Sequence, residues 1–310
     1  MSNRAIDISV AIPSYNRARL LPKAIESVLR QTFQDFELMV VDDGSADNTQ
    51  EVVEGYDDDR IRYIPHDKNR GLNPARNTGI RNARGAFVAF LDSDDEWMPD
   101  KLAEQRRLFD HSPFTRLGVV YAGLELFFPS GEHREIVPRK RGDVLNDQLT
   151  ANLVQGGSNA LVRKDVYEQV GLFDEADALW GGWDDIEMWI RVAHRWQFDF
   201  VPKPLFKMYK HEESRSLVIS KENPDRLIEA LHYVLEKHQA SFDRHPPAKA
   251  RMWRNMGTHH VAADQMSAAR KCFIEAIRAN PGAPRSYMNL LVSLLGAKAY
   301  TTISRRKRGF

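Results

Sequence analysis

The sequence has little cysteine, no long hydrophobic run and no excess of charge of either sign. Its single cysteine, Cys272, excludes an internal disulfide framework and fits a reducing compartment. No apolar run approaches the ~20 residues of a membrane span, and residues 1–20 are polar and interrupted by Pro13, so no signal peptide is expected. A net charge of +1 gives no reason to expect nucleic-acid binding. We therefore expect a cytoplasmic protein without a nucleic-acid partner.

The first hundred residues alternate between apolar runs typical of buried strands and segments with apolar residues at helical spacing. Such β-α alternation indicates a mainly parallel α/β sheet flanked by helices, with ligands at its carboxyl edge. The expected strands are 6–12, 36–41, 61–64 and 87–91, and the expected helices are 20–31, one beginning near 48, and one through 75–83.

Beyond residue 117 the pattern is mixed, and after about residue 223 it becomes purely helical. We therefore expect one domain over residues 1–222 and a small all-α region over 223–310. Within the first domain the later expected strands are 119–121, 124–128, 198–201 and 205–209, and the later expected helices are 164–170 and 184–195.

The helical region has small and aromatic residues at the spacing of a tetratricopeptide repeat. One repeat cannot bury its own apolar face, so it should pack on the neighbouring helices at 227–237 and 287–295. The region is either a surface for a protein partner or a helical cap on the first domain. Its basic tail, 305–308, either contacts anionic lipid at the inner membrane face or is a solvated terminus. The repeat pattern consists of Trp253, Met256, Gly257, His260, Ala269, Phe273, Ala276 and Pro281.

Three carboxylates follow directly after a buried-strand pattern. Residues 85–91 are apolar, and Asp92, Ser93, Asp94 and Asp95 come next. Clustered like charges repel one another unless a cation lies between them, and Mg²⁺ or Mn²⁺ takes oxygen ligands from carboxylates and substrate phosphates. The alternative is a polar loop with helix-capping aspartates. On this run alone, a metal-assisted site for a phosphorylated donor and a structural loop both remain open.

Other polar motifs follow the neighbouring expected strands. Tyr15 leaves the first strand and offers an aromatic face for a base, while Asp42 and Asp43 end the second strand and can accept hydrogen bonds from a base or ribose. Arg76 lies near the start of a helix, where a nucleotide phosphate can bind. Because the carboxyl ends of parallel strands meet at one edge of a sheet, the ordered series indicates a nucleotide site there.

Taken together, these motifs resemble the family 2 glycosyltransferases of the GT-A fold over roughly residues 6–212. The resemblance implies the GT-A nucleotide-sugar transferase fold. It also implies inverting transfer of one sugar from a nucleotide-sugar, UDP-linked in our interpretation, to a hydroxyl of a saccharide, lipid-linked or protein acceptor, with divalent Mn²⁺ or Mg²⁺ as cofactor. The matching stretches are 10–16, 27–32, 40–45, 75–79, 91–95, 159–174 and 184–191.

The resemblance assigns four residues to the nucleoside end of the donor. Pro13 and Tyr15 would line the nucleoside pocket, and Asp43 would receive a hydrogen bond from the uracil ring. Arg76 would lie near the base or the pyrophosphate.

The resemblance also assigns a metal and diphosphate region. Asp92 and Asp94 match the two ends of the family's Asp-x-Asp motif, with Ser93 between them as a further donor-binding residue. Asp92 would face the ribose and metal region, and Asp94 would ligate the divalent ion, which assists departure of the diphosphate. His211 would approach the metal or the diphosphate, with a hydrogen bond within the loop as the alternative.

An acidic pair at the start of an expected helix supplies the candidate general base. Asp185 takes the position of the family's catalytic aspartate, and Asp184 stands where glutamate is more usual. A helix amino terminus stabilises the ionised form that a base requires, although ordinary N-capping would use the same residues. Trp183, Asp184 and Gly157 would form the wall around the donor sugar and the acceptor.

Two other functions use a similar architecture. A scaffold protein would hold a nucleotide without turnover and recruit a partner through its helical region. A nucleotidyltransferase would also use a metal, but it would release pyrophosphate rather than UDP.

Overall fold

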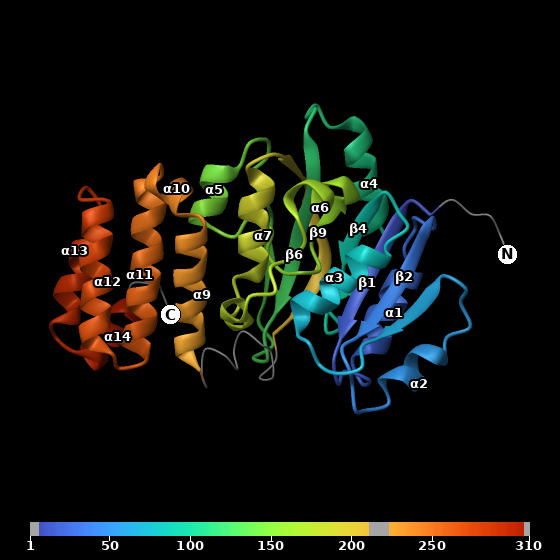
Figure 1. The fold of residues 1–310 in the computed structure, drawn as a ribbon, viewed down its shortest axis with the longest axis horizontal. Coiled ribbons are helices and arrows are strands. Elements are labelled where there is room, and N and C mark those ends of the chain that lie inside the picture. The colour runs from blue at the N-terminus through green and yellow to red at the C-terminus, as the bar shows by residue number, and fades with distance from the viewer. Residues whose placement is uncertain (1–5, 211–222, 307–310) are drawn as a thin grey trace. The chain divides into compact units, whose positions relative to one another are not determined.

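The computed structural model describes residues 6–210 and 223–306 of the chain. Among these residues, the first four strands along the chain form the parallel part of a nine-stranded sheet, in the order β3-β2-β1-β4. A helix follows each of the first three strands, because parallel neighbours need a crossover connection. The strands are β1 Ile8–Ser14, β2 Phe36–Asp42, β3 Ile61–Pro65 and β4 Phe87–Phe90, and the helices are α1 Leu21–Leu29, α2 Thr49–Glu54 and α3 Leu72–Asn82 (Figure 1).

The sheet continues in the order β8-β6-β9-β5, with β7 paired to β6. Strand β8 is antiparallel to both β4 and β6, whereas β6 and β9 are parallel. The sheet is therefore parallel up to β4 and mixed beyond it. The later strands are β5 Glu96–Trp97, β6 Leu117–Phe127, β7 His133–Ile136, β8 Leu161–Arg163 and β9 Gln197–Tyr209, and the helices between them are α4 Lys101–His111, α5 Leu145–Thr150, α6 Lys164–Val170, the short 3₁₀ helix η1 Asp177–Gly181, and α7 Asp184–Ala193.

Alternate side chains of the central strands pack into two separate hydrophobic cores, one on each face of the sheet. On β1, Ala11 belongs to one core and Val10 to the other, and on β4 the same holds for Val88 and Ala89. Helices α3, α6 and α7 contribute to the first core, and α1 and α4 contribute to the second. Because both faces are covered, the loops at the carboxyl ends of the strands are where a ligand can bind.

Strands β6 and β9 are each continuous where the sequence predicts two short strands. Their pairing shifts register at Gly123, where a Cβ atom would lie 2.8 Å from the Ile136 carbonyl oxygen and 2.9 Å from the Lys203 carbonyl carbon. Opposite this point β9 contains Pro202 and Pro204. Proline is tolerated at such an irregularity, because the hydrogen bonds between the strands are interrupted there and the backbone N–H that proline lacks is not needed. The apolar pattern is interrupted there, although the strands continue.

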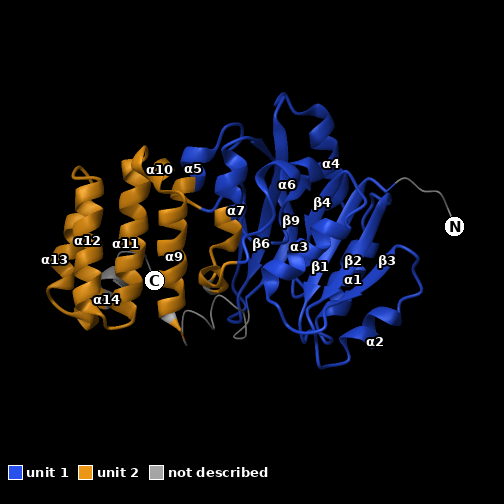
Figure 2. Cartoon of the chain, viewed as in Figure 1, with its two compact units in different colours: residues 1–148, 152–175, 188–211 blue, residues 149–151, 176–187, 212–310 orange. Residues whose placement is uncertain are grey.

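The chain forms two compact units (Figure 2). Unit 1 comprises residues 1–148, 152–175 and 188–211, and it contains the whole sheet. Unit 2 comprises residues 149–151, 176–187 and 212–310. Residue 222, where the first domain was expected to end, lies outside the described residues, so the division into domains 1–222 and 223–310 stays a prediction.

Unit 2 is helical, as the sequence predicts for its C-terminal part. Gly257 and Phe273, two members of the repeat pattern, lie side by side on α11 and α12, because a Cβ atom on Gly257 would overlap the Phe273 ring. Its helices are α9 Pro224–Lys237, α10 Gln239–Asp243, α11 Pro246–Ala262, α12 Met266–Ala279, α13 Pro284–Ser293 and α14 Ala297–Arg306 (Figure 1).

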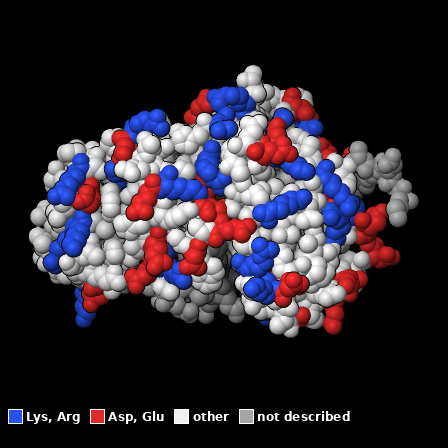
Figure 3. All heavy atoms as spheres, viewed as in Figure 1, with Lys and Arg blue, Asp and Glu red and all other residues white. Residues whose placement is uncertain are grey.

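The described helices and the visible surface agree with the composition. Among the described residues, none of the helices is both long and apolar enough to cross a membrane. Acidic and basic side chains are interspersed on the face shown in Figure 3, in keeping with the net charge of +1.

Candidate active site

The loops that follow β1 and β2 are joined by hydrogen bonds. The Asp43 amide donates to the Ser14 carbonyl oxygen at 2.8 Å, which extends the pairing of the two strands. Asn16, whose φ is +51°, accepts a bond from the Ala46 amide at 2.8 Å, and its own amide donates to Ser45 Oγ at 2.8 Å. A positive φ is uncommon outside glycine but is adopted by asparagine more readily than by most residues, and these contacts hold Asn16 in it. The two strand ends therefore form one ordered edge.

The predicted nucleoside residues differ in their access to solvent. Tyr15 directly follows β1 and is 45% exposed, so its ring is available to a base. Pro13 is buried within β1 opposite Val41, and Ser93 is also buried. Of these three residues, Tyr15 offers the most surface to a ligand.

The buried carboxylate of Asp43 anchors the loop that leads into α3. It accepts hydrogen bonds from the Arg70 amide at 3.0 Å and the Gly71 amide at 2.7 Å, and it contacts His66 Nδ1 at 2.7 Å. The other ring nitrogen of His66 lies 2.9 Å from Thr78 Oγ1 on α3. A carboxylate can accept about four hydrogen bonds, so this geometry leaves Asp43 room for roughly one more.

Arg76, Asp92 and Gly157 meet at the carboxyl end of β4. Arg76 is buried on α3, its Nη2 lies 3.5 Å from Asp92 Oδ1, and its guanidinium lies 5.2 Å from the centroid of the Phe173 ring. A Cβ atom on Gly157 would lie 2.5 Å from Arg76 Nη2 and 2.8 Å from Asp92 Oδ1. A larger residue here would therefore have to displace the ends of these two side chains. Residues from three distant segments that the sequence assigns to the donor site are in contact.

Ser158 connects two members of the acidic cluster. Its hydroxyl accepts a hydrogen bond from the Asp92 amide at 3.0 Å and donates to Asp95 Oδ2 at 2.6 Å. Asp95 is buried, whereas Asp92 and Asp94 are only partly buried. Burial, and then the charges of Asp92 and Asp94, raise the pKa of Asp95 well above its usual range. Asp95 therefore lies in the interior, whereas Asp92 and Asp94 lie toward the surface.

The chemistry of this cluster fits a hard divalent ion. Within residues 6–210 and 223–306, the structure brings no three His, Cys, Asp or Glu side chains together as a metal-binding group, and His211 lies outside those residues. Mg²⁺ usually binds through one or two carboxylates together with substrate phosphates, so a full protein cage is not needed. Burial is the main cause of the raised pKa of Asp95, and a bound cation would relieve the repulsion from Asp92 and Asp94 that adds to it.

The predicted acceptor residues stand at the start of α7, in unit 2. Trp183 has a φ of +68°, an outlier for an aromatic residue, and the Glu187 amide donates to its carbonyl oxygen at 2.9 Å. Asp184 is buried, and Asp185 Oδ1 accepts a hydrogen bond from the Ile186 amide at 2.8 Å. Asp185 thus lies in the first turn of α7, where acidic side chains are common because the helix amino terminus carries partial positive charge.

A buried charge cluster behind this turn was not foreseen from the sequence. Glu187 is completely buried, and its Oε1 lies 2.8 Å from Lys237 Nζ and 3.1 Å from His238 Nε2. No sequence signal marks this cluster, because Glu187 lies about fifty residues from its partners along the chain. His66, by contrast, follows β3 just as Asp43 follows β2, so its position at a strand end could have drawn attention to it.

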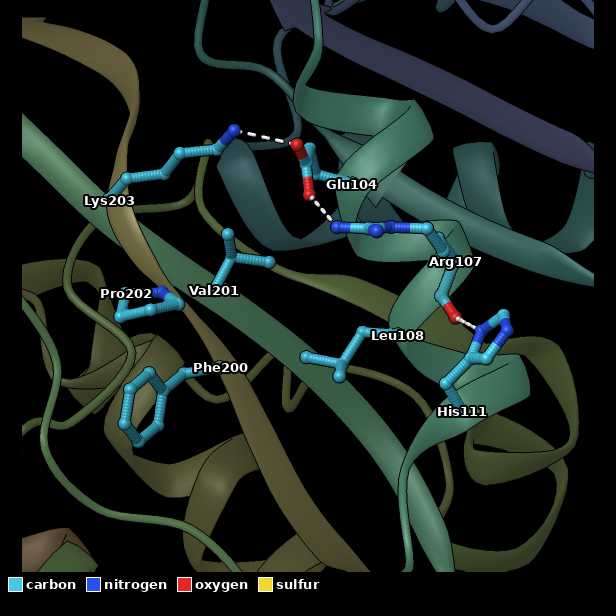
Figure 4. Close-up of a pocket in the computed structure, with 8 residues that line it drawn as sticks. All are labelled: Glu104, Arg107, Leu108, His111, Phe200, Val201, Pro202 and Lys203. Carbon is cyan, nitrogen blue, oxygen red and sulfur yellow. Dashed lines mark hydrogen bonds and ion pairs between the residues drawn. The ribbon is translucent and has the colours of Figure 1, made fainter.

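A separate cavity in unit 1, of about 520 Å³, lies between α4 and β9 (Figure 4). Leu108, Phe200 and Val201 form part of its apolar wall. At its rim, Glu104 bonds both Lys203 at 2.6 Å and Arg107 at 2.7 Å. These charged groups of the rim therefore form ion pairs with one another. None of the predicted site residues lines the cavity.

Comparison with known proteins identifies the family. The sequence profile of "Glycosyl transferase family 2" matches residues 9–171, more than half of the chain. An uncharacterized glycosyltransferase of Rickettsia felis is 29% identical over 250 residues, which cover 77% of this chain and 40% of that protein. The Escherichia coli UDP-Glc:alpha-D-GlcNAc-diphosphoundecaprenol beta-1,3-glucosyltransferase WfgD is 44% identical over 98 residues, which cover 32% of this chain and 39% of that protein. The chain thus spans about two fifths of the length of these curated relatives.

Solved structures share the fold at low sequence identity. S. aureus TarS 1-349 in complex with UDP-GlcNAc has a TM-score of 0.65 at 16% identity, with 98% of this chain and 92% of that chain covered. The mannosyltransferase PcManGT of Pyrobaculum calidifontis, in complex with GDP-Man and Mn²⁺, has a TM-score of 0.63 at 19% identity, with 98% and 84% covered. The predicted α/β GT-A fold followed by helices is confirmed. With this fold and the profile match over its first half, the chain belongs to glycosyl transferase family 2.

Proposed function

We propose that the protein is an inverting, divalent-metal-dependent glycosyltransferase that moves one sugar from a nucleotide-sugar to a hydroxyl acceptor. The observation that carries the proposal is the contact of Arg76, Asp92 and Gly157 at the carboxyl end of β4 in a chain of this family. The Arg76 guanidinium thus lies beside Asp92 of the acidic cluster, where a diphosphate and its metal can be held together.

The donor in this proposal carries uridine. Asp43 has room for one more hydrogen bond, which the imide N–H of a uracil ring can donate, and the exposed ring of Tyr15 can stack on the base. TarS has been solved with UDP-GlcNAc, and WfgD is named for UDP-Glc, whereas PcManGT was solved with GDP-Man. A thermal-shift panel of UDP- and GDP-sugars with Mn²⁺ tests this choice, because a ligand that binds only the folded state raises its stability.

In the proposed reaction, the acceptor oxygen attacks the anomeric carbon as the bond from that carbon to the diphosphate oxygen breaks. Asp185 takes the acceptor proton, and UDP leaves with the electron pair of the broken bond. Asp94, with Asp92 beside it, would hold Mn²⁺ or Mg²⁺, which supplies Lewis-acid stabilisation of the departing diphosphate. Arg76 stays buried and orients the Asp92 carboxylate. Trp183 and Asp184 belong to the wall for the acceptor.

The substitution Asp185→Asn tests the assignment of the base. It keeps the shape of the side chain but removes its basicity, so kcat should fall by about 10²- to 10⁴-fold, the usual contribution of a general base. Binding of UDP in the presence of Mn²⁺, measured by calorimetry, should stay unchanged. The matched control is Asp225→Asn, which removes a carboxylate from the first turn of another helix, α9, and should leave kcat unchanged. Full transfer activity in Asp185→Asn would refute the assignment.

A further inference from the structure

Helix α13 buries two serines and exposes a large apolar side chain. Ser286 and Ser293 are completely buried, whereas Leu291 is 64% exposed. Leu294 and Leu295, just beyond the end of the helix, are 60% and 67% exposed. We call Leu291, Leu294 and Leu295 the leucine patch. A helix on the surface of a soluble protein normally shows the opposite arrangement, so the patch calls for a partner surface.

The fold of unit 2 does not need the leucine patch. Phe273 on α12 stacks on Tyr300 of α14, with ring centroids 5.8 Å apart, and Leu290 and Val292 pack against the same small core. Arg270 Nη2 donates to the Ser293 carbonyl oxygen at 3.3 Å. The turn between α13 and α14 is therefore anchored from inside, and the three leucines are held outward on a fixed support.

The same end of the chain is strongly basic. Residues 266–310 contain nine Lys and Arg residues and a single acidic residue, Glu275, so they carry +8 although the whole chain carries +1. Lys271, Arg285 and Lys298 of this segment are exposed, and Lys298 follows the leucine patch by three residues. The basic residues are Arg270, Lys271, Arg278, Arg285, Lys298, Arg305, Arg306, Lys307 and Arg308.

We propose that the leucine patch, with Lys298 beside it, docks on an anionic membrane surface. Exposed apolar side chains next to clustered cations are the combination that binds at the boundary between lipid headgroups and acyl chains. Charge argues against a second copy of the chain, because a symmetric contact through the patch would bring the exposed Lys298 of each copy to the same interface. The leucines enter the lipid boundary, and the cations approach the lipid phosphates.

Vesicle co-sedimentation tests this proposal. The wild type should sediment with phosphatidylcholine vesicles that contain about 30% phosphatidylglycerol but not with pure phosphatidylcholine, and about 1 M NaCl should weaken the binding. The triple substitution L291S, L294S and L295S should lower the partition coefficient more than tenfold. Lys298→Ala should lower it about fivefold, the effect expected for one cation near such a surface. Arg139→Ala, which removes an exposed cation from unit 1, is the matched control and should change nothing.

Three results would overturn the proposal. In the first, the wild-type protein stays in solution when mixed with anionic vesicles at low salt. In the second, the triple variant binds the vesicles as well as the wild type does. In the third, the wild type does not bind vesicles but forms a dimer in light scattering, and the triple substitution abolishes that dimer. Thermal unfolding of each variant shows that it is folded, and the transition should not move for the triple variant, because its leucines are at least 60% exposed.

Discussion

At the scale of single residues, Gly157 tests whether the contact with Arg76 and Asp92 belongs to the donor site. Gly157→Ala introduces a methyl group within 2.9 Å of Arg76 Nη2 and both Asp92 carboxylate oxygens, so the ends of these side chains must shift away from their present positions. We expect the Kd for UDP with Mn²⁺, measured by calorimetry, to rise at least about fivefold. In the control Gly282→Ala, the nearest atom would be 3.6 Å away, so the Kd should not change. A wild-type Kd in Gly157→Ala would exclude this contact from the site.

Lys101 is the residue whose charge should make stability depend on alkaline pH. This lysine is completely buried. Its Nζ donates a hydrogen bond to Gln105 Oε1 at 2.7 Å and lies 4.1 Å from the centroid of the Trp97 ring. Burial holds the pKa of Lys101 well below its usual range. Between the folded and unfolded pKa values, the unfolded chain binds more protons, so the free energy of unfolding should increase as pH rises.

The substitution Lys101→Met should remove this dependence. Between the folded and unfolded pKa values of Lys101, the free energy of unfolding of the wild type should increase by up to ~1.4 kcal/mol per pH unit relative to that of the variant. This increase should end near pH ~10.4, the pKa of an unperturbed lysine. Urea unfolding from pH 7 to 11 measures the difference. Exposed Lys271→Met should follow the wild type throughout. A constant difference between wild type and Lys101→Met would show that the buried amine does not titrate in this range.

At the scale of elements, Glu187 fixes the turn that carries Asp185. Because Glu187 is buried against Lys237 and His238, Glu187→Gln should leave the Lys237 charge without its partner and lower the free energy of unfolding by roughly 3 kcal/mol. We also expect kcat to fall, with little change in the Kd for UDP, since the proposed nucleotide contacts lie in unit 1. Steady-state kinetics beside urea unfolding separates the two effects.

An exposed glutamate on α9 provides the matched control. Glu229, with a side chain 54% exposed, lies 3.4 Å from Arg226. Exposed ion pairs contribute at most about 1 kcal/mol, so Glu229→Gln should leave both the kinetics and the stability close to wild type. Unchanged kcat in a folded Glu187→Gln variant would mean that the cluster stabilises unit 2 without positioning the base.

Most elements of unit 1 could be predicted because their signals are local. The run 36–41 became β2 and the run 164–170 became α6, since alternation and helical spacing depend on neighbouring residues only. Helix α4 was not predicted, because its apolar residues are few and a fully buried lysine stands at its start. Antiparallel β8 was also missed, because it contains only three residues and its pairing with β4 is made across the sheet.

At the scale of the whole molecule, the sequence assigns segments to a donor site, which stays a prediction, but it does not show how their side chains contact one another. Arg76, Asp92 and Gly157 were assigned from separate motifs, and their contact depends on the packing of α3 beside β4. The inward turn of Asp95 depends on Ser158, sixty-three residues further along. Long-range pairs of this kind leave no periodic pattern in the sequence, so they require the folded structure.

The central claim is that this chain holds a metal-assisted nucleotide-sugar site built around Asp92 and Asp94. Hydrolysis of a panel of UDP-sugars with Mn²⁺, in which water takes the place of the acceptor, tests it directly for the wild type, for Asp94→Asn and for the control Asp100→Asn, an exposed aspartate just before α4. We predict UDP as the nucleotide product, with release abolished by EDTA and by Asp94→Asn but retained in Asp100→Asn. Release of pyrophosphate, absence of turnover with every donor, or activity that survives both EDTA and Asp94→Asn would contradict the account.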